Sequence, residues 1–217
     1  MRKIILCLIA LVVVTVFYSC QTSDGKCHIS GEVVGEKYEG KRIFLIPFYG
    51  AKTHETVDSI EIKDGKFSFV TDSFQMYKIL LDLRYRMGLQ PLIVVGEPGN
   101  ITVTVDSVSH ATGTPQNDSL EQWKMQTEIH NRQYGLMRKN VADLSKRGDT
   151  IQANYIKQRA DSFHLVYKHY TRQLAKNMEG TTLGNFLKDL FPLTYQRKLP
   201  DGRVVTMNAD THEEIPE

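Results

Sequence analysis

The alternation of apolar and polar residues divides most of the chain into two differently patterned parts. Between residues 27 and 112, short apolar stretches with a period of two alternate with turns rich in glycine and polar residues. One stretch, residues 42–47, holds the apolar run Ile43 to Ile46, which is typical of a strand covered on both faces. About seven short strands with frequent turns predict an antiparallel sandwich or barrel.

The clearest turn signal lies between residues 56 and 71. Polar and apolar residues alternate up to Ile62, Asp64-Gly65 follows, and Phe67 and Phe69 return on one face. An Asp-Gly pair between alternating segments favours a tight hairpin because its central positions must accept positive φ. We therefore expect a two-stranded hairpin here.

After residue 113 the apolar period lengthens to between three and four. Asp118, with Glu121 three positions later, is a capping box that predicts the start of a helix. One face of this helix is marked by Leu120, Trp123, Thr127, His130, Tyr134, Met137, Val141 and Leu144. Gly148 ends it and Asp149 caps a second helix, which Gly180 ends, so the short link must fold the two helices back on each other.

The last forty residues are less regular. Residues 183–190 predict a third, short helix before Pro192. The remaining tail is mostly polar, and Asp201-Gly202 favours a small hairpin within residues 199–205.

The first twenty residues indicate where the protein works. Arg2 and Lys3 precede an apolar run that is shorter than the roughly 20 residues of a membrane-spanning helix. The run ends in Ser19 and Cys20, so residues 1–19 have the layout of a secretory leader. The leader resembles a bacterial lipoprotein signal, in which Cys20 is lipidated and becomes the new N-terminus. Cleavage without lipidation and an uncleaved anchor are the alternatives, and all three place the body of the protein outside the cytoplasm.

Removing the leader changes the charge of the chain. The chain has 27 Lys and Arg against 25 Asp and Glu, and two of the basic residues lie in the leader. The mature chain is therefore balanced, with 25 of each. Without a basic block the sequence argues against nucleic acid as a partner, because neutralising phosphates needs clustered Lys and Arg.

Cysteine is sparse, and no Cys-x-x-Cys occurs. Apart from Cys7 in the leader, the chain has Cys20 and Cys27. If Cys20 carries a lipid, Cys27 is left as a lone thiol, either a redox-active thiol or a small apolar residue opening the first strand. If Cys20 is not lipidated, the two could form a disulfide.

No catalytic or cofactor motif emerges. The sequence lacks Gly-x-Ser-x-Gly, Ser-x-x-Lys and a Walker-type loop, and its histidines do not have the spacing of metal ligands. His130 falls on the apolar face of the first helix, where we expect a hydrogen-bonded core or interface histidine. The sequence therefore predicts neither an enzyme nor a metal site.

Loop aromatics are the remaining candidates for a binding surface. Tyr38, Phe48, Tyr49 and Tyr85 lie in or beside loops of the strand-rich part. Exposed aromatic rings can stack on sugars or anchor a protein partner. We therefore treat these four residues as candidate ligand contacts.

The order of several fragments resembles one family. They are Cys20 at the end of the leader, Ile29-Ser30-Gly31, residues 58–60 and 64–69, Glu97-Pro98-Gly99-Asn100-Ile101 and Gly113-Thr114-Pro115-Gln116-Asn117, followed by long helices. This family is a domain of unknown function that precedes thioredoxin-like domains of the AhpC/TSA type in bacterial envelope thiol-disulfide interchange lipoproteins. The likeness covers roughly residues 27 to 190. It implies a small β-sandwich with a helical extension, here without the thioredoxin-like domain.

Together these observations predict a segregated α+β fold: an antiparallel β-sandwich of about seven strands followed by a long antiparallel helical hairpin. The predicted parts are the signal peptide 1–19, a tether 20–26, a sandwich 27–112, a helical region 113–192 and a polar tail 193–217. The expected function is that of a non-catalytic lipoprotein, anchored through Cys20 to a membrane of the bacterial envelope, which binds or positions a protein partner. An accessory role in thiol-disulfide exchange, through Cys27 or by docking a thioredoxin-like protein, and glycan binding are the alternatives.

Overall fold

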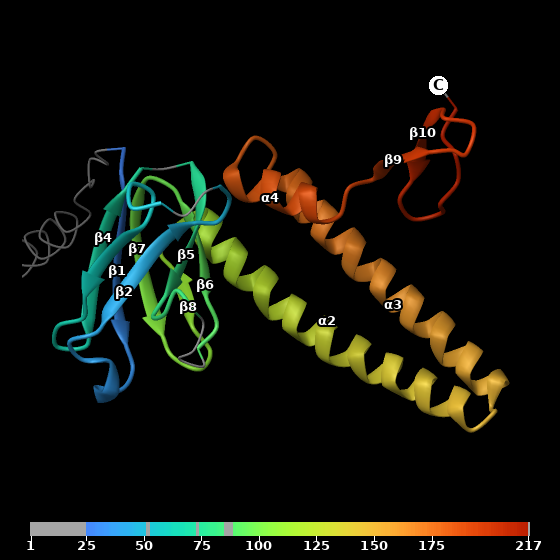
Figure 1. Cartoon of the computed structure of the whole chain (residues 1–217), viewed down its shortest axis with the longest axis horizontal. Helices are drawn as coiled ribbons and strands as arrows, with labels where there is room; N and C mark the ends of the chain where they lie inside the picture. The colour runs from blue at the N-terminus through green and yellow to red at the C-terminus, as the bar shows by residue number, and fades with distance from the viewer. Residues whose placement is uncertain (1–24, 51–52, 73, 85–88, 217) are drawn as a thin grey trace, which may run out of the picture.

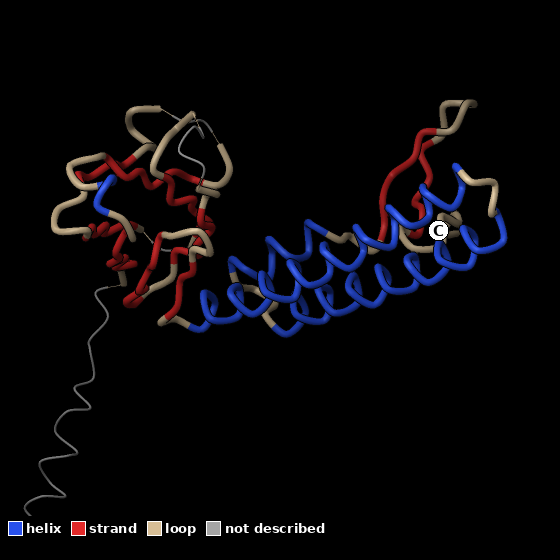
Figure 2. Tube along the Cα trace, turned by 90° about the horizontal axis from the view of Figure 1, so that it is seen from below, coloured by secondary structure: helices blue, strands red, loops and turns tan. Residues whose placement is uncertain are grey.

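The computed structural model describes residues 25–50, 53–72, 74–84 and 89–216. It has mixed α and β content, with two four-stranded sheets at one end and two long helices extending away from them (Figures 1 and 2). The predicted signal peptide, Cys20 and Tyr85 lie outside the described residues, as does most of the predicted tether.

The first sheet has the strand order β4-β1-β7-β8. Its strands are β1 (Cys27–Val33), β4 (Lys66–Thr71), β7 (Gly99–Val105) and β8 (His110–Thr112). β4 is antiparallel to β1, but β1 and β7 pair in parallel, with Cys27 opposite Gly99 and Val33 opposite Val105. The prediction of antiparallel pairing is therefore wrong for β1 and β7. Between β1 and β7 the chain forms β4 and all four strands of the second sheet, so no local turn fixes the relative direction of β1 and β7.

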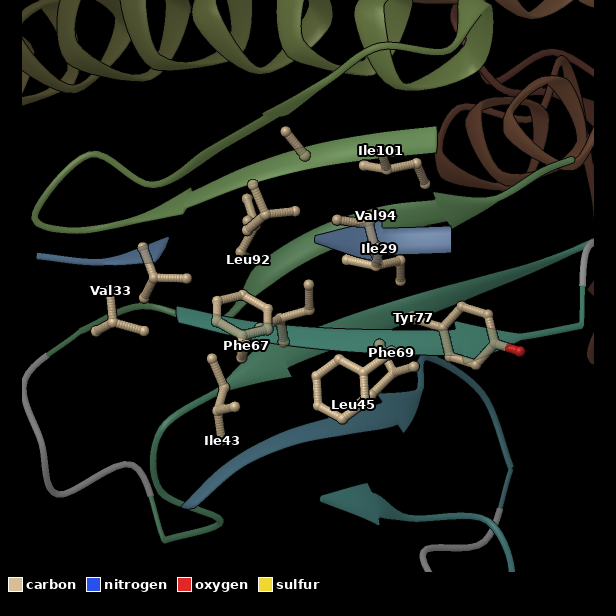
Figure 3. Close-up of a cluster of buried hydrophobic side chains, with 14 of the residues drawn as sticks. Ile29, Val33, Ile43, Leu45, Phe67, Phe69, Tyr77, Leu92, Val94 and Ile101 are labelled. Atoms are coloured by element: carbon tan, nitrogen blue, oxygen red, sulfur yellow. The ribbon is translucent and has the colours of Figure 1, made fainter. Parts of the chain in front are cut away.

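The second sheet has the order β3-β2-β5-β6 and is antiparallel throughout. Its strands are β2 (Arg42–Pro47), β3 (Asp58–Glu61), β5 (Gln75–Leu80) and β6 (Leu92–Gly96), and a short 3-10 helix, η1 (Glu36–Tyr38), precedes β2. Side chains that alternate along the strands of both sheets meet in one hydrophobic core (Figure 3). Ile29 and Ile101 enter this core from the first sheet, and Ile43, Leu45 and Val94 enter it from the second.

The segment predicted as a hairpin connects the two sheets instead. Asp64 and Gly65 form the expected turn with positive φ, and Lys63 bridges to Lys66. However, β3 pairs with β2, whereas β4 pairs with β1. Ile62 follows β3 into the core, where it is fully buried and its N–H donates to the Lys41 carbonyl at 2.8 Å. Burying Ile62 turns the chain out of one sheet and toward the other.

Two long helices, α2 (Pro115–Lys146) and α3 (Thr150–Asn177), lie side by side. The link between them ends in Asp149, whose carboxylate accepts the N–H of Gln152 at 3.1 Å and caps α3. α2 begins at Pro115 with Thr114 as its N-cap, so the predicted cap at Asp118 is four residues late. A proline is favoured in the first turn because its missing N–H would have no helical partner there.

A second hydrophobic cluster joins the helices to the outer face of the second sheet. It contains Met76 and Val95 from the sheet and, from α2, α3 and α4 (Thr182–Leu190), Leu120, Trp123, Ala175, Leu183, Phe186 and Leu187. α4 confirms the predicted third helix. Beyond it, β9 (Thr194–Lys198) and β10 (Val204–Asn208) form a two-stranded sheet whose turn contains Asp201 and Gly202, as predicted.

Candidate functional site

A buried carboxylate caps the first long helix from the sheets. Glu97 follows β6 and is 7% exposed. One oxygen, Oε1, accepts the backbone N–H groups of Gln116 at 2.7 Å and Asn117 at 3.2 Å, and Oε2 accepts the Gln116 side-chain amide at 3.0 Å. Since the N-terminal N–H groups of a helix have no helical partners and carry partial positive charge, a carboxylate here satisfies both needs.

Asn117 completes this junction from the helix side. Its Oδ1 accepts the Val95 N–H at 2.9 Å, and its Nδ2 donates to the Val95 carbonyl and to Thr114 Oγ1, both at 2.8 Å. The side chain therefore pairs with the outer edge of β6 as a neighbouring strand would. Gln116 extends the contact to α4, because its Oε1 accepts the N–H of Leu183 at 2.9 Å.

A glycine lets the two chain segments of the junction approach closely. Gly113 has a φ of 110°, and a Cβ built on it would lie 2.6 Å from the Asn100 carbonyl oxygen. No other residue fits there without moving the backbone. Residues 97–100 and 113–117, two fragments that carried the resemblance, thus meet in one structural joint between sheets and helices.

Cys27, the candidate redox thiol, lies in the core. It is fully buried at the start of β1, and it is the one free cysteine in the described part of the chain. Burial raises the pKa of its thiol, and the charge of Glu97 adds to this, while a backbone hydrogen bond from Glu97 acts in the opposite direction. The thiolate is the nucleophile in disulfide exchange, so a buried thiol with a raised pKa is a poor nucleophile.

The structure does not gather the four candidate loop aromatics on one surface. Tyr38 is 3% exposed and belongs to the core between the sheets. Phe48 and Tyr49 pack edge to face with centroids 4.8 Å apart, and Phe48 also contacts Phe186 of α4. Tyr85 lies outside the described residues. Of the described candidates, only Tyr49, at 60% exposure, presents a large ring surface to solvent.

The interface between α2 and α3 contains three polar pairs. Trp123 Nε1 donates to Thr171 Oγ1 at 3.1 Å, and the hydroxyl groups of Thr127 and Tyr167 share a hydrogen bond of 2.6 Å. In the third pair, His130 Nε2 lies 3.2 Å from His164 Nδ1. His130 is buried and stacks on Tyr167, with centroids 4.1 Å apart, so the prediction of a hydrogen-bonded core or interface histidine is confirmed.

The C-terminal sheet is fastened to α3 by an ion-pair cluster. Asp210 binds both Lys168 and Arg172, and Arg172 also donates to the carbonyls of Phe191 and Pro192 at 2.9 and 3.0 Å. The Arg172 and Lys168 charges and hydrogen bonds hold the pKa of the Asp210 carboxyl well below its usual range, against the opposing effect of burial. No sequence pattern predicts this contact, because Asp210 lies 38 positions from Arg172 and 42 from Lys168.

Comparison with protein families identifies the sheet half. Residues 27–120 match the family model described as a domain of unknown function, DUF4369. The matched residues include both four-stranded sheets. The match ends at Leu120, early in α2, so it includes the Glu97 joint and leaves most of the long helices outside, although the resemblance was expected to extend to about residue 190. Comparisons with curated proteins and with solved structures return no match.

α2 and α3, most of which lie beyond the matched residues, carry exposed apolar side chains. The largest are Met125 and Leu136 on α2 and Ile151, Tyr155 and Val166 on α3, with exposed fractions between 54% and 82%. Residues 113–177 also contain 11 Lys and Arg against 6 Asp and Glu, a net charge of +5. Ile151 and Tyr155 are four residues apart and therefore adjacent on the surface of α3, and adjacent exposed apolar side chains on a basic helix pair are a candidate binding surface.

Two classes of site find no support in the described residues. Within them, no three His, Cys, Asp or Glu side chains are grouped so that they could hold a metal ion. None of the described helices is both long enough and apolar enough to cross a membrane.

Proposed function

We propose that this protein is a non-catalytic binding module of the bacterial cell envelope, anchored to a membrane through a lipid on Cys20. In this proposal the two sheets are a β-sandwich, and α2 and α3 are an antiparallel helical hairpin that serves as the binding arm. The shared core of the two sheets and the short link between the helices support these assignments.

The observation that carries the proposal is the exposed surface of the helix pair. Ile151 is 82% exposed and Tyr155 is 54% exposed, and both belong to the first two turns of α3, whose start is the end farthest from the sheets (Figure 1). A chain that folds for its own stability alone gains nothing from apolar residues placed there. Covering them with another protein would remove them from water.

The charge of the arm defines the partner. The mature chain is neutral, yet residues 113–177 carry +5, so the rest of the mature chain carries the balancing negative charge. An acidic protein surface with an apolar centre complements this arm, and opposite charge raises the rate of association. The partner is therefore an acidic envelope protein.

The binding arm is tested with charge placed on its apolar residues. The double variant I151D/Y155D should lose a partner that photo-crosslinks to the unmodified arm, with binding at least tenfold weaker, because two carboxylates would be buried against an acidic surface. The matched control is V108D, which adds a carboxylate at a 71% exposed valine in the loop before β8. If the unmodified chain, I151D/Y155D and V108D capture the partner equally, the helix pair is not the binding surface.

Anchoring is tested separately. In cells, C20A should abolish incorporation of a labelled fatty acid and move the protein from the membrane fraction to the soluble fraction. Unchanged membrane association together with unchanged lipid labelling would refute the anchor without affecting the arm.

A further inference from the structure

An open depression lies on the second sheet. Its volume is about 510 Å³, within the range of small-molecule sites. It is lined by Lys41, Arg42, Phe44, Leu81, Asp82, Leu83 and Arg84. These residues belong to the start of β2 and to the segment that follows β5.

The floor of the depression is apolar. Phe44 lies between Ile43 and Leu45, whose side chains point into the core between the sheets, so Phe44 faces the opposite side. Leu83, which is 42% exposed, stands beside it in the lining. An apolar ligand group would cover both side chains.

The rim carries more positive than negative charge. Lys41, Arg42 and Arg84 face Asp82, which gives a net charge of +2. Among the described residues none of these three cations forms an ion pair, and Glu61, opposite Arg42 in the strand register, is not bonded to it. The excess is local, because residues 27–112 hold 9 basic against 11 acidic residues.

Arg42 is held in place without being neutralised. Its Nη2 donates to Ser59 Oγ at 2.6 Å and to the Ser59 carbonyl at 3.1 Å, and its Nε donates to Ser59 Oγ at 3.2 Å. Both acceptors are uncharged, so the guanidinium keeps its full charge in a fixed position. A positioned guanidinium binds planar oxyanions well because less conformational freedom is lost on binding.

We propose that this depression binds an amphipathic anion: a small molecule whose apolar body covers Phe44 and Leu83 and whose anionic group is held by Arg42 and Arg84. Lys41 adds charge at the rim. Asp82, whose Oδ1 accepts the N–H of Arg84 at 2.8 Å, shapes the loop and opposes ligands with a carboxylate on that side. The proposal concerns the sheets and stands independently of the binding arm.

The test uses two fluorescent probes that share one ring system. 8-Anilinonaphthalene-1-sulfonate has an apolar body with one sulfonate, and N-phenyl-1-naphthylamine is the same body without the charge. Titrated into the full chain, the sulfonate should bind in a saturable way and about tenfold more tightly than the neutral probe, and R42Q/R84Q should remove that advantage. Neutral-probe binding should not change between the two proteins.

The matched control is R132Q/K139Q, which removes two charges from exposed positions of α2. It should bind both probes as the unmodified chain does. A second variant, L83E, places a carboxylate on the floor and should weaken sulfonate binding at least fivefold; it covers the case in which R42Q/R84Q does not fold. The proposal is overturned if sulfonate binding is unsaturable, if both double variants weaken it equally, or if L83E leaves it unchanged.

Discussion

Replacing Glu97 with Gln should destabilise the joint between the sheets and the helices. The substitution keeps the size of the side chain and removes its charge. Glu97 accepts three hydrogen bonds, two from backbone N–H groups of α2 and one from the Gln116 amide. Glutamine has a single acceptor oxygen, so its amino group must face a donor.

Gln116 cannot relieve this conflict by turning its amide over. Its Oε1 already accepts the N–H of Leu183, and a flip would break that bond. A donor left without a partner in a buried site costs about 1–3 kcal/mol. Loss of the charge at the N-terminus of α2 adds about 1 kcal/mol, so we expect E97Q to lower the free energy of unfolding by about 2–4 kcal/mol.

The assay is urea unfolding followed by far-UV circular dichroism, with hydrogen exchange at the Gln116 and Val95 amides as a local readout. The control is E128Q, which removes the same charge from an exposed position of α2. E128Q should change stability by less than about 0.5 kcal/mol. If E97Q costs no more than E128Q, Glu97 does not support the joint in the way described.

Three further predictions follow from single contacts. G184A should lower the free energy of unfolding by about 1–3 kcal/mol, because a Cβ at this position would lie 2.0 Å from the Met178 carbonyl oxygen. A Cβ at Gly135 would meet nothing within 4 Å, so G135A should stabilise α2 by about 0.5–1 kcal/mol in the same urea assay. Burial, together with His130 and Lys168, lowers the pKa of His164, so below about pH 6.5 the unfolded chain binds a proton that the folded chain does not. The free energy of unfolding should therefore fall with decreasing pH. H164Q should remove the part of this pH dependence that is due to His164. Alkylation of Cys27, followed by peptide mass spectrometry, should be about 100-fold slower in the folded chain than in urea, and equal rates would contradict its burial.

Sequence periodicity predicted the elements well where burial is local. The apolar runs of β2 and β6, the long faces of α2 and α3, and the Asp201-Gly202 turn all depend on neighbours within a few positions. Such patterns show which face of an element is buried, because buried and exposed residues alternate regularly along consecutive positions. They do not specify which other element covers that face.

The failures all involve partners distant in the chain. Asp118 has the form of a helix cap, but Glu97, 19 residues before Gln116, supplies the carboxylate that binds the first N–H groups of α2. Asp64-Gly65 makes its turn, but the core position of Ile62 decides that the two flanking strands enter different sheets. The role of a buried polar residue such as Glu97 therefore becomes clear only when its distant partners are known from the fold.

The distribution of buried residues along the helix pair explains how a rigid joint and an accessible arm can coexist. In α2 the buried residues are Asn117, Leu120, Trp123 and His130, and none follows His130. In α3 the end nearest the link contributes only Ala153 and Ala160. The half of the pair next to the sheets is therefore fixed by a core and by polar pairs that specify its register, whereas the far half has little apolar burial of its own. A partner that covers the exposed apolar residues of the far half would supply the burial that this half lacks, so binding there would also stabilise the ends of both helices.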